Sequence, residues 1–268
     1  MGLTQAEDYR NECEVLDGLL AAVAPSQWNE PTQFKHWTFC DVVGHLHMFD
    51  RAALLTLSDP EGFSELIGVV LKTLSDGKSM RDCTRAWLGE LTGPELLMRW
   101  RQGYLSVGDL YAAADPARRV AWAGPSMSAR SCISARQMET WAHGQALFDA
   151  VGRERRETDS LKNIAVMGIN TFGWAFTNRG LEVPPVRPFV RLKAPSGAFW
   201  EWCEPSASER IEGTAVDFCR VVTQTRNVTD TALAVTGPIA QRWMLIAQCF
   251  AGPAENPPPP GTRCQRVS

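Results

Sequence analysis

The chain has 268 residues, enough for one large domain or two of ordinary size, and 44% of them are hydrophobic and 21% charged. Those fractions are typical of a soluble globular protein with a proper core. The net charge of −3, without any long Lys/Arg cluster, argues against nucleic-acid binding. No stretch reaches the eighteen or so apolar residues that a membrane span needs.

The N-terminal residues and the cysteines indicate the cellular compartment that we expect for the protein. The first twenty residues are acidic and amphipathic, unlike a signal or transit peptide. The eight cysteines form no CxxC pair and show no short, regular spacing, which favours reduced thiols over a disulfide framework. We therefore expect a cytoplasmic protein, as a monomer or homodimer, that binds neither nucleic acid nor membrane.

Helix-period patterns of apolar residues predict four helices in the first 152 residues, joined by shorter connections and one irregular tract at 58–93. The second helix has Thr38 as its N-cap, with Asp41 three positions later as a loose capping box. The predicted helices span 4–24, 38–57, 94–114 and about 128–151. Four helices of this length favour an antiparallel four-helix bundle.

The composition changes after Gly152, a C-cap glycine. Residues 160–180 still have a helical pattern, but PPVRPFVRLKAPSGAFWEWCEPS predicts a β-hairpin around Pro-Ser-Gly. Further helical or mixed segments follow. We therefore predict a four-helix bundle over 1–152, a smaller α+β domain over 153–253, and a disordered proline-rich tail over 254–268.

The stretch QMETWAHGQAL, residues 137–147, places a glutamate and a histidine one helical turn apart. A stripe of alanines shares their face, and we expect that face to be closely packed. A carboxylate buried there without a partner would cost several kcal/mol, roughly, so Glu139 and His143 need a partner. The alanines of the stripe are Ala135, Ala142, Ala146 and Ala150.

A third residue can meet this pair from the second predicted helix. His45 lies beside that helix's apolar stripe and can point into the bundle. Two ligands at i and i+4 from one helix and one from a facing helix make a zinc site with an open position. The alternative is plainer, because Glu-x3-His pairs also occur as simple helix-surface pairs.

Other candidates are less distinctive. Asp50, near the inner face of the second helix, is either an outer-shell carboxylate or general base of the site, or one half of a salt bridge with a neighbouring arginine. Trp37, Trp122 and Trp141 are expected to be core residues or pocket walls. Ser128 is expected to cap the fourth helix.

Several segments, spread over about residues 5–253, carry a family resemblance. WNEPTQFKHWTFCDVVGHLHMFDRAALL, residues 28–55, resembles the second-helix region of the DinB-like metal-binding bundles, in particular the N-terminal domain of the mycothiol-dependent maleylpyruvate isomerases. QMETWAHGQALFDAVG resembles the Glu-x3-His helix of that family. The resemblance implies a bundle that holds a divalent metal, typically zinc, through His45, Glu139 and His143, with a low-molecular-weight thiol such as mycothiol or glutathione as cosubstrate.

The chain departs from this pattern at two places. Relatives usually carry a carboxylate where this chain has Ala146, and of an arginine pair only Arg226 remains, next to Thr225. Arg226 and Asp50 are the candidate catalytic residues. The sequence thus predicts a metal-dependent enzyme that isomerises a small organic metabolite or adds and eliminates a thiol. The alternatives are a metal-assisted cyclisation or rearrangement in secondary metabolism without a thiol, and a non-catalytic metal- or ligand-binding protein.

Overall fold

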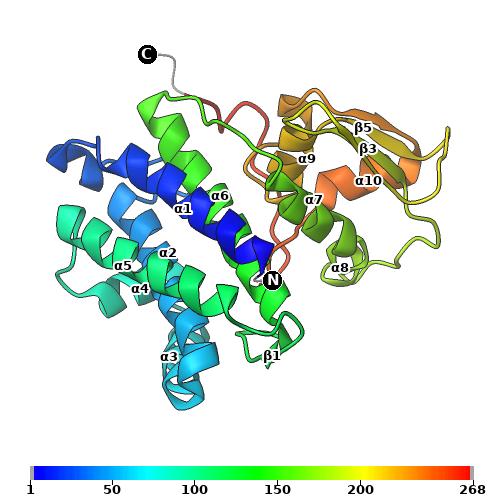
Figure 1. Ribbon diagram of the computed structural model, residues 1–268. Coiled ribbons are helices and arrows are strands. Elements are labelled where there is room, and N and C mark those ends of the chain that lie inside the picture. The colour runs from blue at the N-terminus through cyan, green and yellow to red at the C-terminus, as the bar shows by residue number, and fades with distance from the viewer. Residues whose placement is uncertain (1–2, 266–268) are drawn as a thin grey trace. The chain divides into compact units, whose positions relative to one another are not determined.

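The computed structural model describes residues 3–265, a mostly helical chain with two small sheets (Figure 1). The chain divides into two compact units, residues 1–147 and 148–268. The sequence placed the boundary five residues later, at Gly152, where the long helix ends.

The first unit contains four long helices that lie within a few residues of their predicted positions. Helix α1 packs against α5, and α5 against α2. Helix α6 is tied to α1 by the contact of Thr140 with Cys13, and to α5 by the Tyr111 hydroxyl, which donates to the Cys132 sulfur at 3.1 Å. The bounds are α1 Thr4–Leu20, α2 Phe39–Ser58, α5 Gly93–Ala112 and α6 Ala129–Val151.

The tract expected to be irregular holds two further helices, α3 (Pro60–Ser75) and α4 (Met80–Leu88), so that expectation was wrong. Both begin at clear caps: Asp59 accepts from the Gly62 N–H, and Ser79 forms a capping box with Asp82. Helix α3 has a buried stripe of Phe63, Ile67 and Val70, but further large apolar residues on its solvent side obscure that pattern in the sequence. These are Val69, Leu71 and Leu74. The unit also contains η1 (Pro25–Asn29) and the short antiparallel pair β1 (Arg119–Val120) and β2 (Met127–Ser128).

The start of α2 has the predicted capping box. The Thr38 hydroxyl accepts from the Asp41 N–H at 3.1 Å, and the Asp41 carboxylate accepts from the Thr38 N–H at 2.9 Å. Arg85 from α4 also donates to Asp41 at 2.5 and 2.8 Å. Burial acts to raise the pKa of Asp41, but the bonds from Arg85 and Thr38 outweigh it and lower the pKa below its ordinary value.

An Asp41→Asn variant is expected to lose about 1–2 kcal/mol of unfolding free energy at pH 7, because the cap and its charge-assisted bonds are weakened. A carboxyl with a lowered pKa stabilises the fold above its unfolded-state pKa, and that stabilisation disappears as the pH falls through the folded-state value. Urea unfolding of variant and wild type at pH 7 and near pH 3 checks this, since the difference should shrink in acid. An equal difference at both pH values would contradict the assignment.

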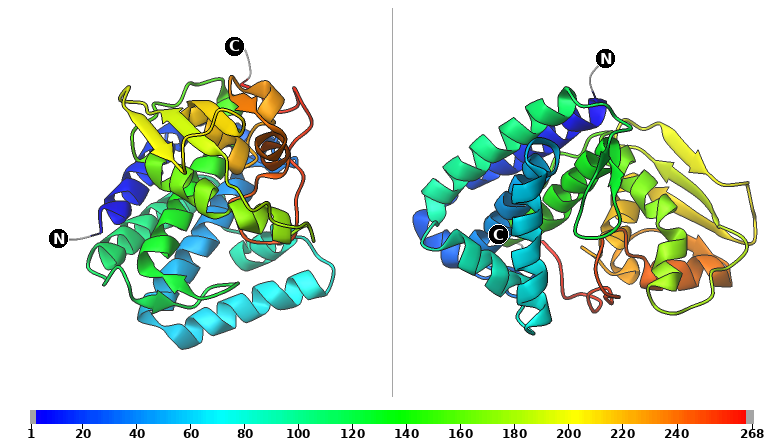
Figure 2. Two further views of the ribbon diagram at one scale, coloured as in Figure 1. Left: turned by 90° about the vertical axis from the view of Figure 1, so that its right-hand side faces the viewer. Right: turned by 90° about the horizontal axis from the view of Figure 1, so that it is seen from below.

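The second unit contains a four-stranded sheet, whose yellow strands are visible in Figure 2. The strand order is β4-β3-β5-β6, with β3 and β5 parallel and the other pairs antiparallel. The predicted hairpin is confirmed as β3 and β4, with Lys193 opposite Phe199. The single helix expected over 160–180 is broken at Thr171, whose hydroxyl donates to the Met167 carbonyl at 2.8 Å. The bounds are β3 Phe189–Lys193, β4 Phe199–Trp202, β5 Arg210–Thr214 and β6 Ala234–Thr236.

Helices accompany this sheet. Helix α9 packs against β3, β5 and α7, and α8 packs against α10. Phe172 and Trp243, in edge-to-face contact at 5.0 Å, join α8 to α10 in the interior, and Phe218 of α9 meets the same indole at 5.9 Å. The bounds are α7 Leu161–Asn170, α8 Phe172–Thr177, α9 Ala215–Val222, η2 Val228–Asp230 and α10 Pro238–Ile246.

Residues 254–265, predicted to belong to a disordered tail, have specific contacts in the structure. Asn227 donates to the Pro258 carbonyl at 2.9 Å, and Arg263 donates to the Gln224 carbonyl at 2.7 Å. Pro258 is buried. These bonds use backbone carbonyls of the tail and of 224–227, which a composition-based prediction does not see. Residues 266–268 of the predicted tail lie outside the described range.

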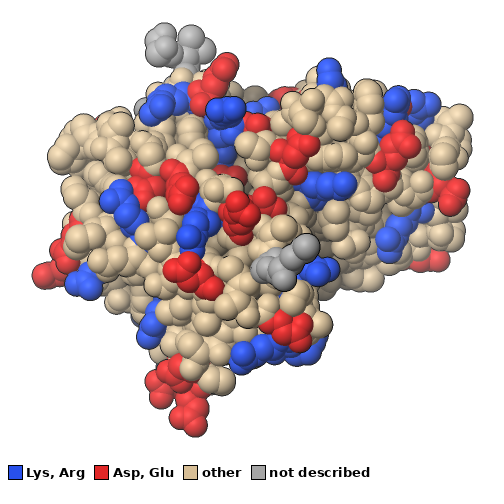
Figure 3. Space-filling view, in the orientation of Figure 1, with Lys and Arg blue, Asp and Glu red and all other residues tan. Residues whose placement is uncertain are grey.

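The surface carries both signs of charge. Acidic and basic side chains are interspersed over the face shown in Figure 3, and neither sign forms a continuous field there. Within residues 3–265, no helix combines the length and the apolar character needed to cross a membrane.

Candidate metal centre

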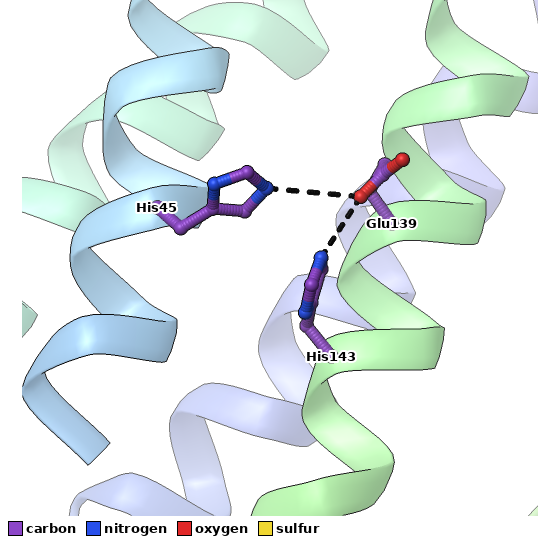
Figure 4. A group of neighbouring side chains, drawn as sticks. All are labelled: His45, Glu139 and His143. Carbon is purple, nitrogen blue, oxygen red and sulfur yellow. Dashed lines mark ion pairs between the residues drawn. The ribbon is translucent and has the colours of Figure 1, made fainter. Parts of the chain in front are cut away.

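Helices α2 and α6 bring three potential metal ligands together in the first unit (Figure 4). Glu139 and His143 lie one turn apart on α6, and His45 points toward them from α2. The same carboxylate oxygen of Glu139 lies 3.0 Å from Nε2 of His143 and 3.8 Å from Nε2 of His45. The structure thus places the three predicted ligand residues side by side.

The charges of these groups suit metal binding. Burial lowers the pKa of His45 to about 4, against the opposing influence of Glu139, so its imidazole is neutral near pH 7. Burial would raise the pKa of Glu139, but its contacts with His143 and His45 outweigh that effect and hold the pKa well below its ordinary value. A neutral imidazole and an ionised carboxylate are the forms that bind a metal ion.

Aromatic rings surround the two imidazoles. The Trp37 indole stacks on His143 with a centroid distance of 6.0 Å and an interplanar angle of 8°, and it meets His45 edge-on at 5.5 Å. Phe34 contacts His143 edge-on at 5.0 Å, and Phe49 contacts His45 at 4.8 Å. Within the described part of the chain, the buried Nδ1 atoms of His45 and His143 have no hydrogen-bond partner. The contacts around the two imidazoles are therefore mainly with aromatic rings.

Phe34 and Trp37 belong to a tight turn just before α2. The Thr32 N–H donates to the Trp37 carbonyl at 2.8 Å, and the Trp37 N–H donates to the Phe34 carbonyl at 2.8 Å. Between them, Lys35 and His36 have φ values of +49° and +56°. Such left-handed conformations cost a non-glycine residue about 1–3 kcal/mol, and they persist where the surroundings fix them, often at functional sites.

Asp50 lies five residues after His45 on α2 and is fully buried. Arg136 of α6 donates to one of its carboxylate oxygens at 3.0 Å, and Trp100 of α5 donates to the other at 2.9 Å. Arg136 is only 1% exposed. Asp50 therefore has the arginine partner considered in the sequence, but on a facing helix in the interior rather than on a helix surface.

The alanine stripe is not the closely packed face that the sequence predicted. All four alanines, at 135, 142, 146 and 150, are half-exposed. The side of α6 that faces its neighbours carries larger groups instead, so the alanines flank that side. The buried residues there include Cys132, Ile133, Arg136, Thr140 and Trp141. Ser128 accepts from the Ser131 N–H at 3.1 Å, as predicted for the cap of this helix.

Arg226 belongs to the second unit. Its guanidinium donates to the Asp149 carboxylate at 2.7 Å and to the Thr225 carbonyl at 2.9 Å, and the side chain is almost completely buried. A buried ion pair of this kind fixes the guanidinium in place. Asp149, its partner, lies six residues after His143 along α6.

Sequence reasoning missed two parts of this centre. Arg136 stands three residues before Glu139, and a charged residue on an otherwise buried helix face is the signal that was available. The second part is the turn that carries Phe34 and Trp37. It was harder to foresee, because Trp37 was expected only as core or pocket wall, and nothing in QFKHW reveals the left-handed residues.

Fold and site together define a mostly helical protein with a candidate His-Glu-His metal centre between two helices. The family model of the mycothiol maleylpyruvate isomerase N-terminal domain matches residues 9–148, and the chain belongs to this family. Two uncharacterised proteins of Mycobacterium tuberculosis, from strains CDC 1551 / Oshkosh and ATCC 25618 / H37Rv, are each 39% identical to it over 247 residues, which are 92% of this chain and 95% of theirs.

Solved structures show the same fold. The crystal structure of the mycothiol-dependent maleylpyruvate isomerase is similar with a TM-score of 0.51 at 14% identity, covering 81% of this chain and 87% of that one. A histidine-to-alanine mutant of that enzyme gives a TM-score of 0.50 with the same coverage. The predicted resemblance to the DinB-like and maleylpyruvate isomerase superfamily is confirmed.

Proposed function

We propose that this chain is a metal-dependent enzyme that acts on a small organic molecule, by isomerisation or by addition and elimination of a thiol. The divalent metal, zinc in our proposal, is held by His45, Glu139 and His143. The observation that carries the proposal is the convergence of three ligand atoms, all within 4.8 Å of one another, on two helices. Membership of the isomerase family supports it.

The donor set fits such an ion. Ligand atoms at about 2.0–2.2 Å from a tetrahedral zinc lie about 3.3–3.6 Å from each other, and the separations of 3.0 and 3.8 Å fall on either side of that range. Three protein ligands leave a position for a substrate or cosubstrate atom. When bound there, the metal supplies positive charge that keeps a thiol in its nucleophilic thiolate form and polarises a substrate oxygen.

The chain's own residues then have distinct tasks. Glu139 supplies the negative charge that offsets the ion, and the imidazoles supply neutral donors. We propose that helices α1, α2, α5 and α6 act as a four-helix bundle that keeps these donors at fixed spacing. Asp50 acts as an outer-shell carboxylate through Arg136, since both of its oxygens already accept hydrogen bonds.

In the thiol-dependent reaction, a bond forms between the thiolate sulfur and one carbon of a cis double bond, while the π bond breaks and its electron pair moves onto the other carbon. Rotation about the resulting single bond is followed by elimination, which restores the double bond and releases the thiol unchanged. Mycothiol and glutathione are the thiols that we consider. Arg226 is our candidate for orienting an anionic substrate group, and it would have to exchange Asp149 for that group.

One observation favours a second candidate function. Ala146 is half-exposed one turn after His143, and it brings no charge to that position. A less polar surrounding suits Lewis-acid-assisted cyclisation or rearrangement of a metabolite without a thiol. A protein that binds metal or ligand without catalysis is the remaining alternative.

Metal analysis of the purified protein tests the proposal. After loading with zinc and desalting, the wild-type protein should retain about one zinc per chain, because three ligands converge on one position. Glu139→Ala and His143→Ala should each lose most of it. His47→Ala is the matched control, since His47 is a half-buried histidine on the same helix as His45 but contacts Trp87 instead. Unchanged zinc in both site variants would show that the ligands are assigned wrongly.

A further inference from the structure

The turn at residues 32–37, called here the aromatic turn, contacts both imidazoles of the metal centre. Trp37 is only 7% exposed and reaches both rings, stacking on His143 and meeting His45 edge-on. Phe34 adds an edge-on contact to His143. Centroid distances of 5.0–6.0 Å lie within the range in which aromatic rings attract one another.

By contrast, no hydrogen bond from residues 3–265 to the Nδ1 atoms orients these rings. A histidine that ligates a metal almost always donates its second ring N–H to a carboxylate, carbonyl or water, which fixes the tautomer and the ring plane. Here Nδ1 of His45 and Nδ1 of His143 are buried and have no such partner among residues 3–265. The task of fixing the ring planes therefore falls to whatever packs against them.

We propose that Trp37, assisted by Phe34, is the positioning residue of the metal centre and holds both ligating imidazoles by ring packing. The inference rests on the proposed function, because it concerns the ligands of that site. One indole that touches both rings couples their orientations, so that neither imidazole can turn without losing contact with it.

The backbone of the turn supports this role. Lys35 and His36 are consecutive non-glycine residues with positive φ. The turn is closed by the Thr32–Trp37 hydrogen bond and by a β-bridge between Pro31 and Thr38. Thr38 is in turn the N-cap of α2, the helix that carries His45. The strained turn thus attaches the indole to the start of the ligand helix at a fixed distance, which is the kind of constraint for which strain is retained.

Two measurements test the proposal on Trp37→Ala, Trp37→Phe and Phe34→Ala. The first is zinc affinity by competition with a chromophoric chelator, together with the visible spectrum of the cobalt-substituted protein. Trp37→Ala should bind zinc about 10–100-fold more weakly, as is typical when the groups that orient metal ligands are removed, and its cobalt spectrum should change. Trp37→Phe should recover part of the affinity, and Phe34→Ala should lose less than Trp37→Ala.

The second measurement needs no metal. In the metal-free protein, the ring carbon–proton signals of His143 should be displaced by the ring current of the stacked indole. They should return toward the values of a free histidine in Trp37→Ala. Trp87→Ala is the matched control. Trp87 packs on His47, which lies on α2 like His45 but is not one of the proposed ligands. This variant should leave zinc affinity and the His143 signals unchanged. If Trp37→Ala fails to fold, the same measurements on Phe34→Ala still test the proposal, because Phe34 is only half-buried.

The outcomes separate the two levels of the proposal. Wild-type zinc affinity and an unchanged cobalt spectrum in both Trp37→Ala and Phe34→Ala would overturn the positioning role and leave the metal site standing. If the wild-type protein binds no zinc but its His143 signals still depend on Trp37, the ring packing is supported and the proposed function fails. A loss of affinity as large in Trp87→Ala as in Trp37→Ala would also overturn the inference, because the effect would then be general destabilisation.

Discussion

An Arg136→Met variant is expected to lose about 3–5 kcal/mol of unfolding free energy, the cost of leaving a buried charge without its partner. Arg136 and Asp50 are 1% and 0% exposed and lie 3.0 Å apart between α6 and α2. Methionine fills much of the arginine's volume, so the charge is the main quantity that changes. Urea unfolding followed by far-ultraviolet circular dichroism measures the loss.

The control is Arg99→Met, which removes an arginine from an exposed pair with Glu95 at 3.9 Å. Exposed pairs contribute about 0–1 kcal/mol, so this variant should stay close to wild type. The double variant Asp50→Leu/Arg136→Met should recover much of the loss, less about 1–3 kcal/mol for the Trp100 N–H that then lacks its acceptor. Equal losses in Arg136→Met and Arg99→Met would contradict a buried pair.

Zinc is expected to raise the stability of the wild-type protein by about 2.7 kcal/mol when its free concentration is a hundred times the dissociation constant. The gain arises because the three ligands are assembled only in the folded chain. Mycothiol or glutathione should raise the melting temperature further, and only in the zinc-loaded protein, if a thiol occupies the open position. Thermal unfolding with and without zinc and thiol checks both effects.

His45→Ala serves as the control, since it should remove the response to zinc and with it the response to thiol. Stabilisation by zinc without any thiol effect, together with stabilisation by a hydrophobic metabolite, would favour the rearrangement without a thiol. A melting temperature that does not change with zinc would contradict both enzymatic proposals.

The proximity of the three candidate ligand residues could be predicted because helix geometry relates sequence spacing directly to space. Glu139 and His143 share a face wherever residues 139–143 are helical, and the apolar pattern of α2 indicated the side on which His45 lies. Asp50 was identified, but its partner was not, because a contact between residues 86 positions apart depends on how two helices face each other.

The same distinction applies to the rest of the molecule. The four long helices and the β3–β4 hairpin were predictable from periodicity and turn residues. Helix α3 was missed since its exposed leucines and valine blur the pattern, and the contacts of residues 254–265 were missed because backbone carbonyls accept them. The aromatic turn was the hardest part to predict, because surrounding contacts impose the left-handed conformations of its two residues, rather than the residues' own preferences.

The buried pair of Asp50 and Arg136 also constrains how this chain can evolve. A natural protein has only about 5–15 kcal/mol of stability, so losing either partner alone would use a large part of it. Replacing the pair requires two substitutions, and each intermediate is expected to have lost a large part of its stability. We therefore expect lineages to keep both charges or to exchange both together. Residues at the edge of the candidate metal centre, such as Ala146, are free to vary one at a time. Changes of substrate can then accumulate around a core that changes rarely.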